Sequence, residues 1–211
     1  MTPGRSEPGT RRAWDRPRPG RRVRGLAGGK LGEVAIYVGS EAARGVPKLL
    51  IPRPAFATSS ADELASAIDG SYFNNRKYQG SLDYGQVKYI AALWMGFLAR
   101  KHTDLRFITM SPGNTAGTQS FSDASAPLRF VAQHFLQPIV FPALGIGHHL
   151  QDGARRIADA LTDPSLTSGA FYASAEKKIT GPVIDQATII PDLRSTTIQD
   201  HADQAIHRFI H

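Results

Sequence analysis

The sequence predicts an α/β fold, in which parallel strands alternate with helices. Two apolar stretches rich in β-branched residues, 33–40 (EVAIYVGS) and 105–110 (LRFITM), have the composition of buried strands. Between them, residues 84–100 place apolar side chains around most of a helical circumference, which is typical of a helix that is buried or lies in a subunit interface. A strand, a helix and a second strand in this order predict that 33–40 and 105–110 are neighbouring parallel strands.

The other predicted elements rest on shorter signals. Ser59 or Ser60 can cap a short helix that has Asp62 and Glu63 in its first turn and runs to Gly70. Later segments predict an apolar helix at 128–141, an amphipathic helix at 152–161, a last short strand at 169–173 and a polar terminal helix at 192–211. The segment at 120–127 is expected to be a mobile loop.

Residues 1–32 differ in composition from the rest of the chain. They are rich in Pro, Gly and Arg and show no periodic apolar pattern, so we expect a disordered extension. Eight Arg against two acidic residues in the first 24 positions account for +6 of the formal net charge of +7. Arg11 and Arg12 lack the apolar region of an export signal, and the prolines disfavour a helical transit peptide. Nucleic-acid binding is not predicted, because no pattern of aromatic side chains accompanies the charge.

The remainder, 33–211, is nearly neutral and long enough to form one domain with a core. The absence of Cys excludes disulfides and thiolate chemistry. No apolar run reaches the ~18 residues of a membrane span, and we expect a cytoplasmic protein. The glycines at 25–32 precede a strand instead of joining a strand to a helix, which disfavours a phosphate loop. His148 and His149 are interpreted as loop residues, since no further metal ligands have matching spacing.

Tyr84 and Lys88 are the first candidate reactive groups. They are four residues apart, which on a helix stacks them on one face, one turn apart. A phenol ordinarily titrates near ~10, and a fixed cation nearby favours the ionised form. A phenol held in this way can exchange a proton with an alcohol or a carbonyl oxygen. The same spacing also arises by chance on surface helices, so the pair alone does not define a site.

The pair is followed in register by the apolar helix, by the strand at 105–110 and by the turn Ser111-Pro112-Gly113. In this combination the chain resembles the short-chain dehydrogenase/reductase family, and most closely the branch of retinol dehydrogenases and protochlorophyllide reductases. The resemblance covers residues 33–192, which correspond to the second half of such an enzyme. It implies a partial doubly wound parallel sheet of the Rossmann type, of which the last three strands are present.

The resemblance implies hydride transfer between NAD or NADP and a small carbonyl or alcohol substrate. Tyr84 would exchange the proton, Lys88 would favour the ionised phenol and hold the nicotinamide ribose, and Ser40 would hold the substrate oxygen. Ser40 is preferred because it follows a strand, whereas the spacing in compact members would select Ser71. The nicotinamide would lie against a loop containing Pro112, Gly113, Asn114, Thr115 and Thr118. In this loop Thr118, or alternatively Thr115, would hold the carboxamide.

The resemblance also implies a cofactor-binding half before residue 33, with a Gly-rich turn for the pyrophosphate and a residue that selects NAD or NADP. This sequence lacks that half, so the alternative prediction is a truncated and catalytically inactive remnant. A sheet that stops at residues 33–40 would expose an edge. Together with the apolar helix at 84–100, this edge predicts self-association of the chain, as a homo-oligomer or an aggregate.

Overall fold

The structure is a computed structural model that describes residues 33–46, 52–74, 76–77, 79–115 and 147–210. Four predictions fall outside these residues: the disordered extension at 1–32, the mobile loop at 120–127, the helix at 128–141 and the cofactor contact at Thr118.

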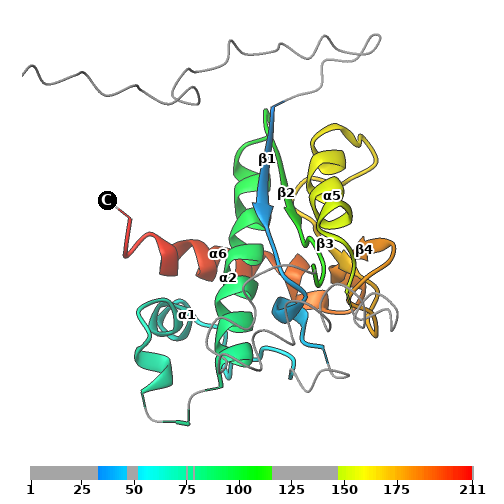
Figure 1. Cartoon of the computed structure of the whole chain (residues 1–211). Coiled ribbons are helices and arrows are strands. Elements are labelled where there is room, and N and C mark those ends of the chain that lie inside the picture. Colours follow the sequence, from blue (N-terminus) through cyan, green and yellow to red (C-terminus); the bar gives the residue numbers. More distant parts are fainter. Residues whose placement is uncertain (1–32, 47–51, 75, 78, 116–146, 211) are drawn as a thin grey trace, which may run out of the picture. The chain divides into compact units, whose positions relative to one another are not determined.

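The described residues form a sheet of four strands in the order β1-β2-β3-β4 (Figure 1). The strands are β1 (Val34–Val38), β2 (Arg106–Met110), β3 (Phe171–Ser174) and β4 (Val183–Asp185). β1 pairs parallel with β2 along its whole length, with Val34 opposite Arg106 and Val38 opposite Met110. β2 in turn pairs parallel with β3. The prediction of two neighbouring parallel strands at 33–40 and 105–110 is confirmed.

The prediction that the strand at 169–173 is the last one is wrong. β3 occupies 171–174 and is followed by β4, which pairs antiparallel with it. β4 is only three residues long, too short to show an alternating pattern in the sequence. The sheet is therefore mostly parallel with one antiparallel edge strand, an arrangement that is common in α/β proteins.

Three predicted helices are present with small shifts at their ends. α1 (Ala61–Ile68) begins after Ser60, whose hydroxyl accepts a hydrogen bond from the Glu63 amide at 3.3 Å. α5 (Leu150–Thr162) covers the prediction at 152–161, and α6 (Thr196–Ile206) lies inside the prediction at 192–211.

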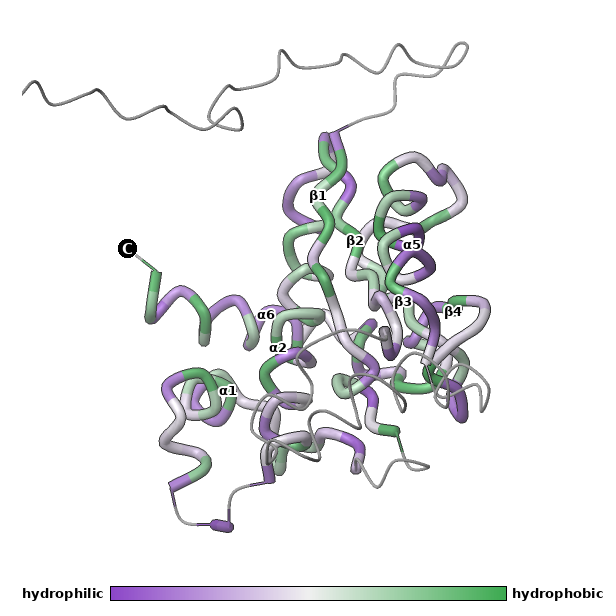
Figure 2. The backbone as a smooth tube through the Cα atoms, in the orientation of Figure 1, coloured by the Kyte–Doolittle hydropathy of each residue, from purple (hydrophilic) through white to green (hydrophobic). Residues whose placement is uncertain are grey.

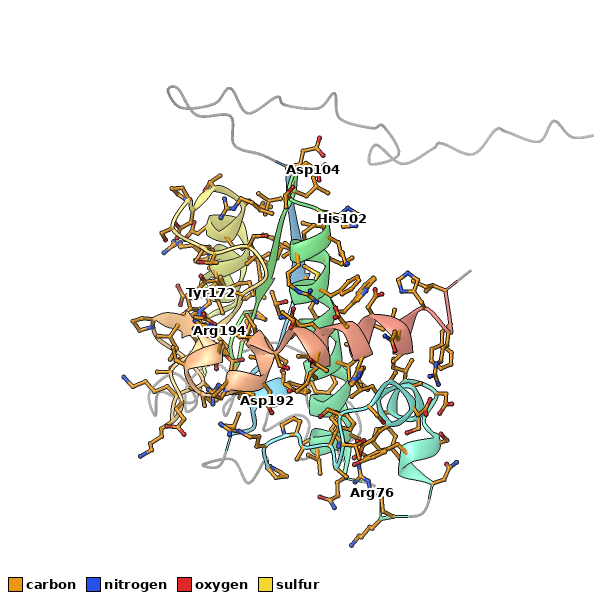
Figure 3. The ribbon with its side chains drawn as sticks, turned by 180° about the vertical axis from the view of Figure 1, so that it is seen from behind. Arg76, His102, Asp104, Tyr172, Asp192 and Arg194 are labelled. Atoms are coloured by element: carbon orange, nitrogen blue, oxygen red, sulfur yellow. The ribbon has the colours of Figure 1, made fainter. Side chains whose placement is uncertain are left out.

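The helix between the first two strands, α2 (Gly80–Lys101), begins one turn before Tyr84, where it was expected to start. The extra turn is held by Asp83, whose carboxylate accepts a hydrogen bond from the Gln79 amide at 3.2 Å and pairs with Arg76. Figure 3, which shows the molecule from behind, places Arg76 near one end of α2 and His102 at the other.

The sheet has a hydrophobic core on each face. Alternate residues of β3 point to opposite sides: Phe171 packs with α2 residues such as Leu93, and Tyr172 packs with the cluster that includes Ala160 of α5. Hydrophobic residues recur along α2 and β1 in Figure 2. The result is a layer of helices on each side of a central sheet, which is the architecture expected for an α/β fold.

α6 covers part of α2, which explains why α2 is apolar on several sides. The two helices are in contact, and the indole N–H of Trp94 donates a hydrogen bond to Asp203 at 3.0 Å. Figure 3 shows α6 crossing in front of α2. Tyr84 and Val87 remain 50% and 43% exposed, so only part of the apolar surface predicted to mediate self-association is left uncovered. None of the described helices has the length and apolar character needed to cross a membrane.

Candidate functional site

The candidate site is a pocket of about 530 Å³ at the carboxyl ends of β1 and β2. It is lined by seven of the eight predicted site residues: Ser40, Tyr84, Lys88, Pro112, Gly113, Asn114 and Thr115. The carboxyl ends of strands are where open α/β sheets bind their ligands, and the volume is typical of a site for a small molecule. A second hollow, of about 320 Å³ between α2, β3 and α6, contains none of the predicted residues.

Ser40 enters the pocket because β1 ends just before it. Its backbone is extended, and it caps the short 3₁₀ helix η1 (Glu41–Arg44) by accepting a hydrogen bond from the Ala42 amide at 3.2 Å. This bond uses a lone pair of the hydroxyl oxygen and leaves its proton available to a substrate oxygen.

The alternative, Ser71, is elsewhere. It begins the 3₁₀ helix η3 (Ser71–Phe73), its amide donates to Asp69 at 2.8 Å and its hydroxyl donates to the Ser66 carbonyl at 3.4 Å. Ser71 is exposed and does not line the pocket. The described geometry therefore favours Ser40 over Ser71 as the hydroxyl that can reach a ligand in this pocket.

Tyr84 and Lys88 lie on one face of α2, as their spacing predicts. The Lys88 ammonium is 5.7 Å from the centre of the Tyr84 ring and 4.7 Å from that of Tyr37. It also donates a hydrogen bond to the Val38 carbonyl at 3.0 Å. Lys88 thus has a fixed position between the end of β1 and Tyr84, and Tyr84 is half exposed toward the pocket.

The loop after β2 forms the opposite wall. Gly113 has a φ of 79°, a conformation that other residues rarely adopt, and an added Cβ would lie 2.7 Å from both Arg156 Nη1 and His148 Nε2. His148 Nε2 is 2.6 Å from the Pro112 carbonyl, so this nitrogen carries the proton and donates it. His148 therefore has a structural role in the loop. Within the described residues no group of His and acidic side chains could hold a metal ion.

A buried polar network, two of whose members (Glu41 and Ser111) line the pocket, was not predicted from the sequence. Glu41 accepts hydrogen bonds from the hydroxyls of Ser111 and Ser174, and Arg156 Nη1 lies 3.7 Å from its Oε1 atom. Burial lowers the pKa of the Arg156 guanidinium, while the Glu41 carboxylate acts in the opposite direction. The four residues come from segments far apart in the chain, and no local pattern indicates that they meet.

Arg44 is a second buried cation that the sequence did not reveal. Its guanidinium donates to the backbone carbonyls of Gly45, Ala175, Glu176 and Lys178, which joins η1 to the turn after β3. Burial is the main cause that lowers the pKa of Arg44. The first residues after β1 are therefore anchored to the rest of the fold by two buried charges, Glu41 and Arg44.

The described residues fit one end of a nicotinamide dinucleotide. A hydroxyl, a phenol, an ammonium group and a Pro-Gly loop line a single pocket, and the first three are donors that suit a carbonyl oxygen and the hydroxyls of a ribose. In contrast, no Gly-rich turn joins a strand to a helix in the described part of the chain, and such a turn is the usual pyrophosphate site.

No family model matches this chain, and no curated protein matches it. Among solved structures, the crystal structure of an uncharacterized protein from Mycobacterium paratuberculosis aligns with a TM-score of 0.41 and 16% sequence identity. The alignment covers 82% of this chain and 51% of the other, so this chain spans about half the length of that protein. A likeness this distant supports no conclusion about function.

Proposed function

We propose that the chain is a nicotinamide-dependent oxidoreductase of the short-chain dehydrogenase/reductase type, acting on a small carbonyl or alcohol substrate. The observation that carries this proposal is the convergence of Ser40, Tyr84 and Lys88 with residues 112–115 on one pocket at the carboxyl ends of parallel strands. Three segments separated by dozens of residues supply these groups. Their convergence would be unexpected if the Tyr–Lys spacing were accidental.

Each residue has a role that its surroundings allow. Tyr84 exchanges a proton with the substrate oxygen, because its phenol is half exposed in the pocket. Lys88, held beside the Tyr84 ring, donates to a ribose hydroxyl, and Ser40 donates its hydroxyl proton in a hydrogen bond to the substrate oxygen. Residues 112–115 contact the carboxamide end of the cofactor. NAD or NADP, when bound, supplies or receives the hydride.

The test begins with binding. The full chain is titrated with NADPH and with NADH, and the fluorescence of the reduced nicotinamide is followed. We expect one of the two nucleotides to bind saturably. Adding its oxidised form should displace it and reverse the fluorescence change. Turnover is then measured with small aldehydes and ketones. If neither nucleotide binds at ~1 mM, which corresponds to only about 4 kcal/mol of binding free energy, the proposal is wrong for this chain.

Two matched variants assign the proton transfer. Tyr84→Phe removes the phenol from the pocket and should lower turnover by ~10²–10⁴-fold, the usual contribution of a general acid or base. It should leave nucleotide affinity largely unchanged. Tyr72→Phe removes a hydroxyl that does not line the pocket and should retain full activity. Equal activities of the two variants would exclude Tyr84 from the chemistry.

The alternative proposal is a catalytically inactive remnant of such an enzyme. The observation in its favour is the lack of a Gly-rich pyrophosphate turn in the described residues. This alternative predicts a folded pocket with weak nucleotide binding and no turnover. Addition of a nucleotide-binding half before residue 33 should then produce activity that Tyr84→Phe abolishes.

A further inference from the structure

A buried carboxylate forms part of the floor of the pocket. Glu41 follows Ser40 in the chain, is only 6% exposed and belongs to η1. Its side chain turns toward the interior, under the carboxyl ends of β2 and β3. Carboxylates are almost never this buried unless other groups compensate their charge. None of the proton-transfer roles proposed above uses Glu41, so its burial needs another explanation.

The contacts of Glu41 join the ends of all three parallel strands. Oε2 accepts a hydrogen bond from the hydroxyl of Ser111, the residue that follows β2. Oε1 accepts from the amide of Ser174 at 3.3 Å and from its hydroxyl at 3.1 Å, at the end of β3. Ser111 and Ser174 are themselves fully buried. Since Glu41 follows β1, a single carboxylate links the three segments that close the pocket from below.

Arg156 of α5 supplies the compensating charge. Its Nη1 atom is 3.7 Å from Glu41 Oε1, and its Nη2 atom donates to the Ser174 hydroxyl at 3.1 Å and to the Gly181 carbonyl. The pair is largely withdrawn from water, with 12% and 7% of the two side chains exposed. Removal of one member of such a pair leaves the other charge buried and uncompensated, which is more costly than the pair is stabilising.

The network continues from Glu41 to the wall of the pocket. Ser111 has one hydroxyl proton and gives it to Glu41, so its oxygen is left to accept the Gly113 amide at 3.1 Å. This bond shapes the Pro112–Gly113 turn. A neutral amide in place of the carboxylate would turn its NH₂ group toward Ser111 or Ser174, both of which donate to Glu41. If it faces Ser111, the Ser111 hydroxyl has to redirect its proton, which disturbs the hydrogen bond from the Gly113 amide.

We propose that Glu41 is a positioning residue for the nicotinamide side of the pocket. It fixes the loop at 111–115 relative to the turn that carries Ser40, through Ser111 and with Arg156 as its counter-ion. This inference rests on the proposed function for its ligand, but the positioning itself is a property of the chain without ligand. It predicts that the loop loses order when the charge is removed, while the rest of the fold keeps it.

Amide hydrogen exchange of the ligand-free chain tests the positioning. In Glu41→Gln we expect the amides of Gly113 and Asn114 to exchange about tenfold faster, which corresponds to ~1.4 kcal/mol, within the net contribution of a typical hydrogen bond. Amides of α6 should be unaffected. The control is Glu33→Gln, which makes the same change at an exposed carboxylate and should alter neither region. The double variant Glu41→Gln/Arg156→Met removes both charges and should recover part of the protection.

Two results would overturn the inference: equal acceleration in the loop and in α6, which indicates a general loss of stability, or no acceleration in the loop. Binding adds a separate readout. Glu41→Gln should weaken NADPH by about tenfold and leave ADP-ribose unchanged, because ADP-ribose lacks the nicotinamide. If the unaltered chain binds neither ligand, the proposed function fails, and the exchange data still decide the role of Glu41.

Discussion

Gly85 controls how closely α2 approaches the turn that carries Ser40. An added Cβ at this position would lie 2.4 Å from the Ala42 carbonyl oxygen and 3.0 Å from its carbon. Ala42 belongs to η1, the 3₁₀ helix that begins directly after Ser40, and Gly85 directly follows Tyr84. The contact between the two backbones therefore sets the distance between the proposed proton donor and the proposed hydroxyl that holds the substrate.

Gly85→Ala should push these two segments apart. Because Cβ contacts below 3.0 Å are essentially never seen, the separation must grow from 2.4 Å to at least 3.0 Å, a shift of 0.6 Å or more. Neither partner is a flexible side chain that could rotate away. Overpacking of this kind costs ~1–3 kcal/mol, and the higher helix propensity of alanine offsets ~1 kcal/mol of it. A displacement approaching ~1 Å can lower turnover by ~10²-fold.

The matched control is Gly96→Ala, at another glycine of the same helix. Its Cβ would meet the side-chain nitrogen of Gln199 at 2.5 Å, and this nitrogen, which donates to the Leu193 carbonyl, does not line the candidate pocket. Both variants are compared by urea unfolding and by the rate of NADPH turnover with a small carbonyl substrate. We expect Gly85→Ala to have a lower free energy of unfolding and a lower turnover than the unaltered chain. Gly96→Ala should leave the pocket, and therefore turnover, unchanged. A Gly85→Ala protein with unaltered stability and activity would refute the role given to this contact.

Three further outcomes are expected. Leu93 of α2 is fully buried in the core that also contains Phe171 of β3, so Leu93→Ala should lower the free energy of unfolding by ~2–5 kcal/mol in a denaturant titration. Burial by itself would raise the pKa of Glu63, but hydrogen bonds from Thr58 and neighbouring amides outweigh it and hold the pKa below its usual 4.5. The stabilising effect of Glu63 should thus be complete above pH 4.5 and disappear as the pH falls through the lowered pKa, so Glu63→Gln should match the parent only in acid. Light scattering should show self-association that Val87→Glu reduces; a monodisperse monomer would contradict it.

The backbone plan was readable from the sequence because its signals are local. Residues 33–40 and 105–110 are apolar and β-branched, and they form β1 and β2 almost as predicted. The proximity of Ser40 and Tyr84 also follows from the order of the elements along the chain. Ser40 lies where β1 ends, and Tyr84 lies near the start of the helix that crosses to the next strand. β4 was missed because three residues carry no period.

The buried polar network could not be predicted in the same way. Glu41 meets Ser111, 70 residues away, and Ser174, 133 residues away, and such pairings depend on the register of the whole sheet. The close approach of α2 to η1 does have a local signal in the sequence. Gly85 is an isolated glycine inside an otherwise strong helix, and such a residue usually has a packing reason.

The position of Lys88 shows how far the site depends on the register of β1. The Arg106 amide donates to the Glu33 carbonyl and the Gly39 amide donates to the Met110 carbonyl, so the odd-numbered residues of β1 direct their backbone groups toward β2. The carbonyl of Val38 therefore points away from β2, where it accepts the hydrogen bond from Lys88. A slip of one residue would turn this carbonyl into the sheet and reverse the two faces of the strand. The apolar packing that fixes the register of β1 thus also fixes the ammonium group beside Tyr84.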